Sequence, residues 1–233
     1  MSAVDPERAS CDEERCRKGS RAWQELRRAS RPEMVYDGHH MKRPGTRSKD
    51  ASHERIVEAA ARAIRRSGYN GTGVADIMKD AGLTHGGFYA HFASREAMLA
   101  EAADRAGGEA IAMMEHVAAT LPAEQVLPAM MQAYLSKAHV KAIETGCAVA
   151  ALGSEMPRQA PEVRRVATRR IKEMIRLVAR QLAERGEAAP DERAQFMVAA
   201  MVGTLVLARA VDDPRLSNAL REAALKQLTP NQD

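Results

Sequence analysis

Residues 83–92 read LTHGGFYAHF, and this stretch combines two features that rarely occur together. Its aromatic residues are spaced as in a short helix, yet Gly86 and Gly87 are adjacent, and glycine costs a helix interior about 1 kcal/mol relative to alanine. Phe88 and Phe92 stand four residues apart, so they share one helix face, which we predict to pack inward. The opposite face holds only small or polar residues, and we predict that it contacts a partner.

Two helical patterns precede this stretch. Ser52 is expected to cap the first helix, and Gly68 lies just past its end. Thr72 is expected to cap the second helix, which Gly82 closes, and Thr84 then caps a third. A helix, a short glycine-containing turn and a second short helix form a helix-turn-helix, whose second helix enters the DNA major groove. The alternative is a glycine-bearing connection between helices that has no partner.

Basic residues are concentrated around this motif. Residues 42–95 hold ten Lys and Arg against five Asp and Glu, whereas residues 1–41 hold eight of each and residues 96–233 hold 17 against 18. The formal net charge of +4 therefore arises in the segment that contains the motif. Such an excess is expected of a phosphate-binding surface, although a solvated helix face has the same composition.

The composition favours a helical, cytoplasmic protein. Only 3% of the 233 residues are aromatic, so the core must be built from aliphatic residues and the 13 methionines. No stretch approaches the roughly 18 uninterrupted apolar residues of a membrane helix, and the N-terminus has no apolar signal-peptide core. The three cysteines (Cys11, Cys16 and Cys147) form no C-x-x-C pair, which favours reduced thiols over a disulfide framework.

We divide the chain into three parts. Residues 1–46 lack apolar periodicity and are predicted to be a disordered or weakly helical extension, within which Met41 is an alternative start. Residues 47–94 are predicted to form a helix-turn-helix domain, and residues 95–233 a larger helical domain for regulation and dimerisation. Four basic residues before the first helix are predicted to form a mobile arm that enters the minor groove, with plain charge attraction as the alternative: Lys42, Arg43, Arg47 and Lys49.

The remainder of the chain shows helical patterns only, so the predicted fold class is all-α. We expect helices at about 95–118, 123–142, 147–156, 162–186, 191–212 and 216–228, separated by glycine and proline. Pro128 falls inside one of them and is expected to delay or kink it. Gly107 and Gly108 lie near the middle of the 95–118 helix, and we expect them to be a soft point at which alanine would be tolerated.

The order of these features resembles the tetracycline-repressor (TetR/AcrR) family of bacterial regulators. The resemblance covers about residues 48–102, through the pattern L-T-x-G-x-F-Y-x-H-F followed by S-[RK]-E at the head of a long helix. Gly146–Glu155 also resembles a G-C-x-V-A-A-L-x-S-E segment of some members. The family implies an all-α homodimer that binds a double-stranded DNA operator, most often a repressor released by a small-molecule effector.

The resemblance also implies roles for single residues. Thr72, Gly73, Tyr89, His91 and Arg95 would contact phosphates; His85, Gly86, Gly87 and Ala90 would line the base edges, after the cap at Thr84. Family members often have lysine or arginine where this chain has His85. Because histidine lacks arginine's bidentate contact with guanine, the operator sequence cannot be read from these residues.

The C-terminal domain holds the candidates for effector binding. These are Met114, Met131, Tyr134, Cys147, Met174 and Phe196. Methionines suit adaptable apolar pockets, although a single methionine is more often plain core. Cys147 near a helix N-terminus is a candidate reactive thiol, although a buried inert cysteine is the commoner outcome. No residue spacing indicates a metal site, a cofactor or an enzyme.

Three functions remain open from the sequence. The first is a ligand-responsive repressor that dimerises through the apolar helix at 193–211 and the helix after it. That apolar helix would also suit the buried centre of a monomer. The second is a thiol-based redox or electrophile sensor acting through Cys147. The third is an architectural DNA-binding protein without a sensor, which the large C-terminal domain disfavours.

Overall fold

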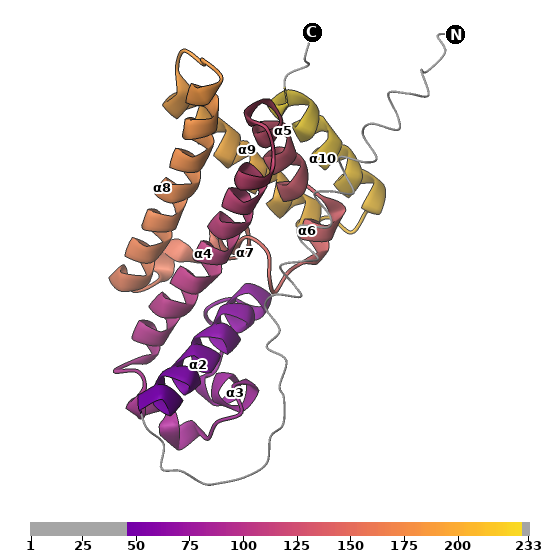
Figure 1. The fold of residues 1–233 in the computed structure, drawn as a ribbon. Coiled ribbons are helices and arrows are strands. Elements are labelled where there is room, and N and C mark those ends of the chain that lie inside the picture. The colour runs from indigo at the N-terminus through magenta and orange to yellow at the C-terminus, as the bar shows by residue number, and fades with distance from the viewer. Residues whose placement is uncertain (1–45, 230–233) are drawn as a thin grey trace, which may run out of the picture. The chain divides into compact units, whose positions relative to one another are not determined.

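The computed structural model describes residues 46–229, with side chains from residue 49 onward, and this part of the chain contains helices and no strands (Figure 1). The helices are α2 (Thr46–Ser67), α3 (Val74–Asp80), η1 (His85–Ala90), α4 (Arg95–Thr120), α5 (Ala123–Tyr134), α6 (Lys137–Lys141), α7 (Ala148–Leu152), η2 (Met156–Arg158), α8 (Pro161–Glu184), α9 (Pro190–Ala210) and α10 (Pro214–Leu228). The expectations about the N-terminal extension, Cys11, Cys16, Met41, Lys42 and Arg43 lie outside the described residues. The predicted all-α fold class is confirmed.

The described residues fall into two compact units. We call residues 46–110 with 143–172 the N-terminal unit, and residues 111–142 with 173–229 the C-terminal unit. The boundaries fall inside α4 and inside α8, so the first part of each of these helices packs with the N-terminal unit. The predicted division between residues 94 and 95 stays a prediction.

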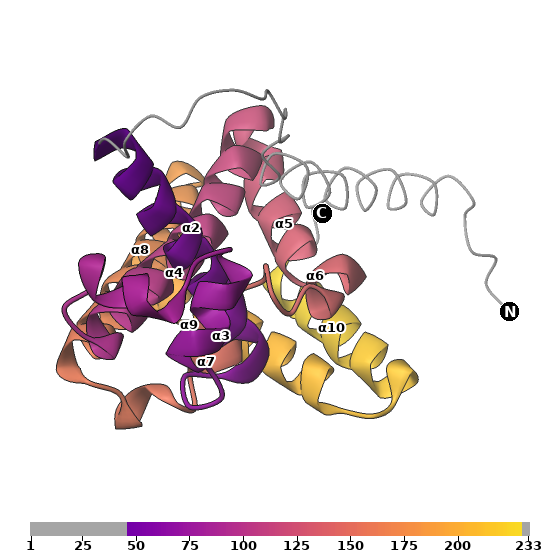
Figure 2. The same ribbon diagram turned by 90° about the horizontal axis from the view of Figure 1, so that it is seen from below.

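The N-terminal unit is built around α2, which packs against α3 and α7 (Figures 1 and 2). Its apolar face buries Ile56, Ala60 and Ile64 completely, as the helical spacing predicts. The helix begins at Thr46, six residues before the predicted cap at Ser52. Arg47 and Lys49 therefore belong to a helix, and the prediction that they form a mobile arm is wrong.

Two glycines end the first two helices as predicted. Gly68 and Gly82 have φ angles of 73° and 69°, a left-handed conformation that glycine adopts without steric cost. The predicted cap of the second helix is wrong, because Gly73 rather than Thr72 occupies the N-cap position of α3. The hydroxyl of Thr72 instead donates to the carbonyl of Gly68 over 2.6 Å, so this side chain closes the turn between α2 and α3.

The third helix, η1, is a 3₁₀ helix rather than an α-helix. Thr84 is its N-cap residue, as predicted, but the Thr84 side chain makes no capping hydrogen bond. The amide of Gly87 donates to the carbonyl of Thr84, the three-residue step of a 3₁₀ turn. Phe88 and Phe92 are buried and stack with ring centroids 5.6 Å apart, which confirms the predicted inner face.

The C-terminal unit contains a break that the sequence analysis missed. The predicted helix at 123–142 is divided into α5 and α6, because Ser136 adopts an extended conformation and accepts a hydrogen bond from the amide of His139. Pro128 lies inside α5 without ending it. Proline has no amide to donate to the carbonyl of Glu124 four residues earlier, and Arg185 Nη1 donates to that carbonyl over 2.8 Å.

The helices α9 and α10 form a hairpin (Figure 2). Asp213 caps α10 by accepting from the amide of Arg215, and Ser217 donates to the carbonyl of Ala208 over 2.7 Å. The buried face of α9 contains Met197 and Met201. By length and hydropathy alone α9 would cross a membrane, a property that a core helix of a water-soluble protein can share, and it is the one helix of residues 46–229 with that property.

The helix α4 runs without interruption through Gly107 and Gly108. A Cβ atom at residue 107 would lie 2.6 Å from Cγ of Arg170, closer than real Cβ atoms approach. At residue 108 a Cβ would lie 3.1 Å from Nη2 of the same arginine. The glycine pair therefore makes room for Arg170, and the expectation that alanine is tolerated at Gly107 is wrong for this steric reason.

Candidate nucleic-acid interface

The outer face of η1 is open to solvent. His85, Gly86 and Ala90 are exposed, and 76% of Tyr89 is accessible although it is a large aromatic residue. A Cβ atom on Gly86 would meet nothing within 4 Å, whereas one on Gly87 would make ordinary contact with Met78 at 3.7 Å. The two glycines thus keep this face flat, which suits close approach of a large surface.

Burial of the two phenylalanines holds this face outward. Phe88 packs edge-on against Tyr89, with ring centroids 5.2 Å apart, and Phe92 stacks on His53 of α2 at 4.6 Å. The buried rings fix the rotation of η1 about its axis, because turning it would expose them. Because Phe88 and Phe92 are buried, Tyr89 and Ala90 are directed away from the core.

Arg95, predicted to contact phosphate, binds the protein itself. Its Nη2 donates to the carbonyl of Tyr69 and, over 3.1 Å, to the carbonyl of Thr72. These are the two ends of the turn that joins α2 to α3. Arg95 thus fixes the position of α3 from the head of α4, and the structure favours a positioning role for it. Gly73, beside that turn, is exposed, whereas Thr72 is buried.

His91 lies on the edge of the same surface with one ring nitrogen buried. Its Nδ1 has no hydrogen-bond partner within the described residues, and its ring centroid lies 6.0 Å from that of His53. Burial lowers the pKa of His91 below its usual 6.5, and the nearby His53 and Lys49 lower it further. His91 is therefore neutral near pH 7, so that a phosphate contact would come from its Nε2–H and not from a positive charge.

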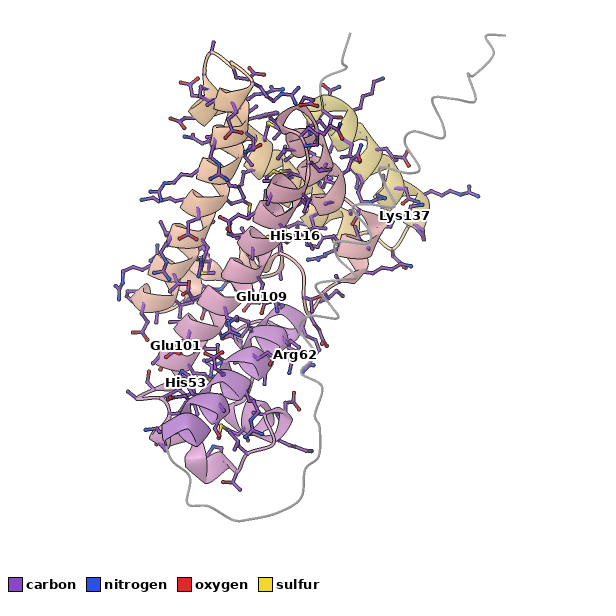
Figure 3. The ribbon with its side chains drawn as sticks, in the orientation of Figure 1. His53, Arg62, Glu101, Glu109, His116 and Lys137 are labelled. Atoms are coloured by element: carbon purple, nitrogen blue, oxygen red, sulfur yellow. The ribbon has the colours of Figure 1, made fainter. Side chains whose placement is uncertain are left out.

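Ion pairs join α2 to α4 beside this surface. His53 Nε2 of α2 lies 2.6 Å from a carboxylate oxygen of Glu101 of α4, and both residues are labelled in Figure 3. Arg65, whose side chain is 1% exposed, donates to Glu109 over 2.7 Å. The carboxylate of Glu54 raises the pKa of Arg105 by accepting its hydrogen bond. Local sequence patterns gave no signal for these pairs, since the partners are 40 or more residues apart.

Glu155 makes another contact that the sequence did not predict. Its Oε2 accepts a hydrogen bond of 2.9 Å from the amide of Tyr69, the residue that follows the C-terminus of α2 and Gly68. A Cβ on Gly68 would collide with the same carboxylate. Burial raises the pKa of the Tyr69 hydroxyl, and the charge of Glu155 raises it further. The resemblance of Gly146–Glu155 to a family segment was the only sequence signal for this contact.

The candidate effector-binding residues do not come together. Met114, Met131, Tyr134 and Met174 are buried in the C-terminal unit, and the ring of Tyr134 packs edge-on against His139 at 4.8 Å. Cys147 belongs to the N-terminal unit, where it is 1% exposed and is the N-cap residue of α7. Phe196 is 58% exposed on α9. No group of three or more His, Cys, Asp or Glu residues between 49 and 229 is placed to hold a metal ion.

Family models match both parts of the chain. The model described as "Bacterial regulatory proteins, tetR family" matches residues 56–102, which include α3, η1 and the start of α4. The model described as "Tetracyclin repressor-like, C-terminal domain" matches residues 123–224. The chain belongs to the TetR family of helix-turn-helix transcriptional regulators.

Curated relatives and solved structures agree with this assignment. The chain is 31% identical over 121 residues to an uncharacterized HTH-type transcriptional regulator of Mycobacterium tuberculosis, a match that spans 49% of this chain and 61% of the relative. A TetR-family regulator of Agrobacterium tumefaciens has a similar fold, with a TM-score of 0.67, 22% identity and coverage of 78% of this chain and 100% of that chain. The reduced form of NemR from Escherichia coli also has a similar fold, with a TM-score of 0.67 and 19% identity. That match covers 76% of this chain and 95% of the NemR chain.

Proposed function

We propose that this regulator is a homodimeric repressor that binds an operator through the outer face of η1 and is released by a small molecule held in the C-terminal unit. Its site of action would be the cytoplasm, where the DNA is. The observation that carries the operator contact is the flat, exposed face of η1, with Tyr89 76% accessible and open space around Gly86. Helix-turn-helix proteins place this element in the major groove.

The operator contact is tested by adding bulk to that face. Gly86→Leu places an apolar side chain where nothing lies within 4 Å, so the fold is expected to stand while major-groove docking is blocked. Ala188→Leu adds the same bulk at an exposed residue between α8 and α9 and serves as the control. Footprinting on the protein's own upstream region should show protection by the control and none by Gly86→Leu. Equal protection by both variants would exclude the η1 face as the reading surface.

The exposed face of α9 supports the dimer. Phe196 and Leu207 are 58% and 52% exposed, and a Cβ on Gly203 between them would meet nothing within 4 Å. Exposed apolar side chains gathered on one helix face mark an association surface. Two copies of α9 and α10 would form a four-helix bundle. Leu207→Glu should therefore give a monomer in analytical ultracentrifugation, and a variant that remains dimeric would place the interface elsewhere.

Effector binding is proposed for the methionine-lined interior of the C-terminal unit. Met114, Met131, Met174 and Tyr134 are all buried in that unit, and methionine side chains adapt to apolar ligands of different shapes. Met131→Trp would crowd that interior, because Met131 is completely buried. A panel of apolar small molecules should stabilise the wild-type protein against heat and should not stabilise this variant, provided that its own melting remains cooperative.

The thiol-sensor hypothesis gains no support from the exposure of Cys147. Its side chain is 1% accessible, whereas reactive cysteines are at least partly exposed. The hypothesis that Cys147 is a redox sensor is still worth testing, because NemR, a protein of similar fold, has been described in a reduced form. Intact-mass measurement after maleimide treatment of the native protein decides it: rapid modification of Cys147 with loss of DNA binding would establish the thiol sensor in place of reversible effector binding.

A further inference from the structure

A stripe of basic residues follows the outer face of α8. Its five members occur at intervals of four, three, four and four residues and are exposed: Arg165, Arg169, Lys172, Arg176 and Arg180. At 100° per residue they lie within about 80° of one another around the helix axis, and at 1.5 Å per residue the stripe is about 22 Å long. The blue nitrogen tips of side chains along the outer edge of α8 are visible in Figure 3.

Most of this positive charge is not neutralised by the protein. Arg169 pairs with Asp104 of α4 over 2.6 Å, and the other four members form no ion pair within the described residues. Of the acidic side chains on α8, Glu162 and Glu173 are half-buried, and the exposed Glu184 follows the last member of the stripe by one turn. The summed charge of residues 96–233 gives no sign of this stripe, because their basic and acidic residues nearly cancel.

The chemistry of the stripe selects a polyanion. No exposed large hydrophobic side chain of residues 49–229 lies on α8, and such side chains are expected at the centre of a protein interface or on a helix that lies in a lipid surface. Interfaces with DNA are instead polar and strongly positive. A row of about 22 Å is long enough to meet several phosphates on the side of a duplex that faces it. Three of the four unpaired members are arginine, the residue best suited to binding phosphate.

We propose that the α8 stripe is a second DNA-binding surface, which contacts the phosphate backbone of duplex DNA without reading its sequence. This contact is separate from the operator contact of η1 and goes beyond it. A protein bound to its operator would use the stripe to hold a further length of DNA.

The test uses the full chain and a 30-base-pair duplex of mixed sequence. The background variant is Gly86→Glu, which puts a negative charge on the open face of η1 and is expected to repel DNA there. On this background the stripe variant replaces the four unpaired members with glutamine: Arg165→Gln, Lys172→Gln, Arg176→Gln and Arg180→Gln. The matched control removes the same charge at four exposed residues elsewhere: Lys137→Gln, Lys141→Gln, Arg215→Gln and Lys226→Gln.

Binding is measured by fluorescence anisotropy between 50 and 300 mM salt, a range set by the counterion-release effect. The logarithmic salt slope changes by about 0.9 for each phosphate contact, so the stripe variant should have a slope shallower than the control by about 3 to 4. Equal slopes in the stripe and control variants overturn the proposal. A Gly86→Glu background that no longer binds the duplex even at 50 mM salt would also overturn the proposal, because the stripe would then hold no DNA by itself.

Two further probes test whether the α8 stripe binds a lipid surface or an acidic protein instead of DNA. Vesicles of phosphatidylserine and poly-glutamate are titrated against the same three proteins, and thermal melting by circular dichroism shows that each is folded. Loss of vesicle or poly-glutamate binding in the stripe variant, with an unchanged DNA salt slope, would assign the stripe to a lipid surface or to an acidic protein and would overturn the DNA proposal.

Discussion

The helices inside the N-terminal unit are connected by different interactions from those inside the C-terminal unit. In the N-terminal unit, charged side chains connect the helices: Arg65 binds Glu109, and Arg170 binds Asp104. In the C-terminal unit, buried methionines fill the space between helices, and Arg209 donates to the carbonyls of His139, Val140 and Ala142 at the end of α6. Directional pairs fix geometry, whereas flexible thioethers tolerate changes in shape. Ion pairs between helices are thus concentrated in the N-terminal unit, whereas the C-terminal unit relies more on buried methionines and on charged hydrogen bonds to the backbone.

The largest effect is expected from Arg95→Ala in the N-terminal unit. The change removes two hydrogen bonds to backbone carbonyls, those of Tyr69 and Thr72, and charged hydrogen bonds contribute about 1.5–3 kcal/mol. Because two such bonds are lost, the free energy of unfolding in urea should fall by about 3–6 kcal/mol. The salt slope of DNA binding should stay as in the wild type, since a positioning residue neutralises no phosphate. A shallower slope with unchanged stability would restore Arg95 to the phosphate contacts.

Gly107→Ala should destabilise the same unit by about 1–3 kcal/mol, the usual cost of overpacking. The new methyl group would lie 2.6 Å from Cγ of Arg170 and force α4 and α8 apart where they meet. Gly86→Ala, whose Cβ meets nothing within 4 Å in the same unit, is the control and should not lower the stability. If both variants melt at the wild-type temperature, close packing at Gly107 does not contribute to the stability of the contact between α4 and α8.

The C-terminal unit should show its own response to pH through His139. Burial lowers the pKa of His139 to about 3, against the hydrogen bond to the carbonyl of Tyr134, which raises it. Below about pH 6.5, His139 therefore binds a proton in the unfolded chain but stays neutral in the folded chain. The free energy of unfolding thus decreases as the pH falls from 6.5 towards 3. This one group contributes about 1.4 kcal/mol per pH unit.

His139→Asn is the variant that isolates this contribution, because the asparagine amide can still donate to the carbonyl of Tyr134. Urea unfolding at pH 7, 6 and 5 should give a shallower dependence on pH for the variant than for the wild type. His116→Asn, which makes the same change at an exposed histidine of α4, is the matched control. Parallel curves for wild type and His139→Asn would contradict the assignment.

The smallest effect is expected from Glu58→Gln. The carboxylate of Glu58 pairs with Arg62 one turn later in α2, but both side chains are about one-third exposed. Pairs of this kind contribute about 0.3–0.5 kcal/mol and are weakened by salt. Stability should fall by a few tenths of a kcal/mol in low salt and should match the wild type in 1 M salt. A loss as large as that of Arg95→Ala would show that exposed ion pairs also fix the geometry of this unit.

Local patterns predicted much of this architecture. The i, i+4 spacing of Phe88 and Phe92 predicted the buried face of the third helix, and Gly68 and Gly82 predicted the ends of the first two. These features depend on residues within one or two helical turns. The same kind of pattern failed at Ser136, where a cap inside an apolar stretch divides a predicted helix.

The candidate site was less predictable, because side chains there bind groups that are distant in sequence. Arg95 donates to carbonyls 23 and 26 residues earlier, which no local pattern indicates, and its phosphate contact stays a prediction. Glu155 accepts from an amide 86 residues away, and no local pattern indicates such a partner. The exposed residues Tyr89 and Gly86 could be predicted as surface, but exposure alone does not say which atoms of DNA they meet.

The hydrogen bond from the amide of Tyr69 to Glu155 has a consequence for engineering sensors by domain grafting. A chimera that joins residues 46–94 to the effector-binding part of another regulator would leave Glu155 behind. The amide at the end of α2 would then need a new acceptor, and Gly68 would face whatever side chain replaced the carboxylate. Grafts that also carry residues 143–172 keep this contact and are the better starting point for transferring DNA specificity.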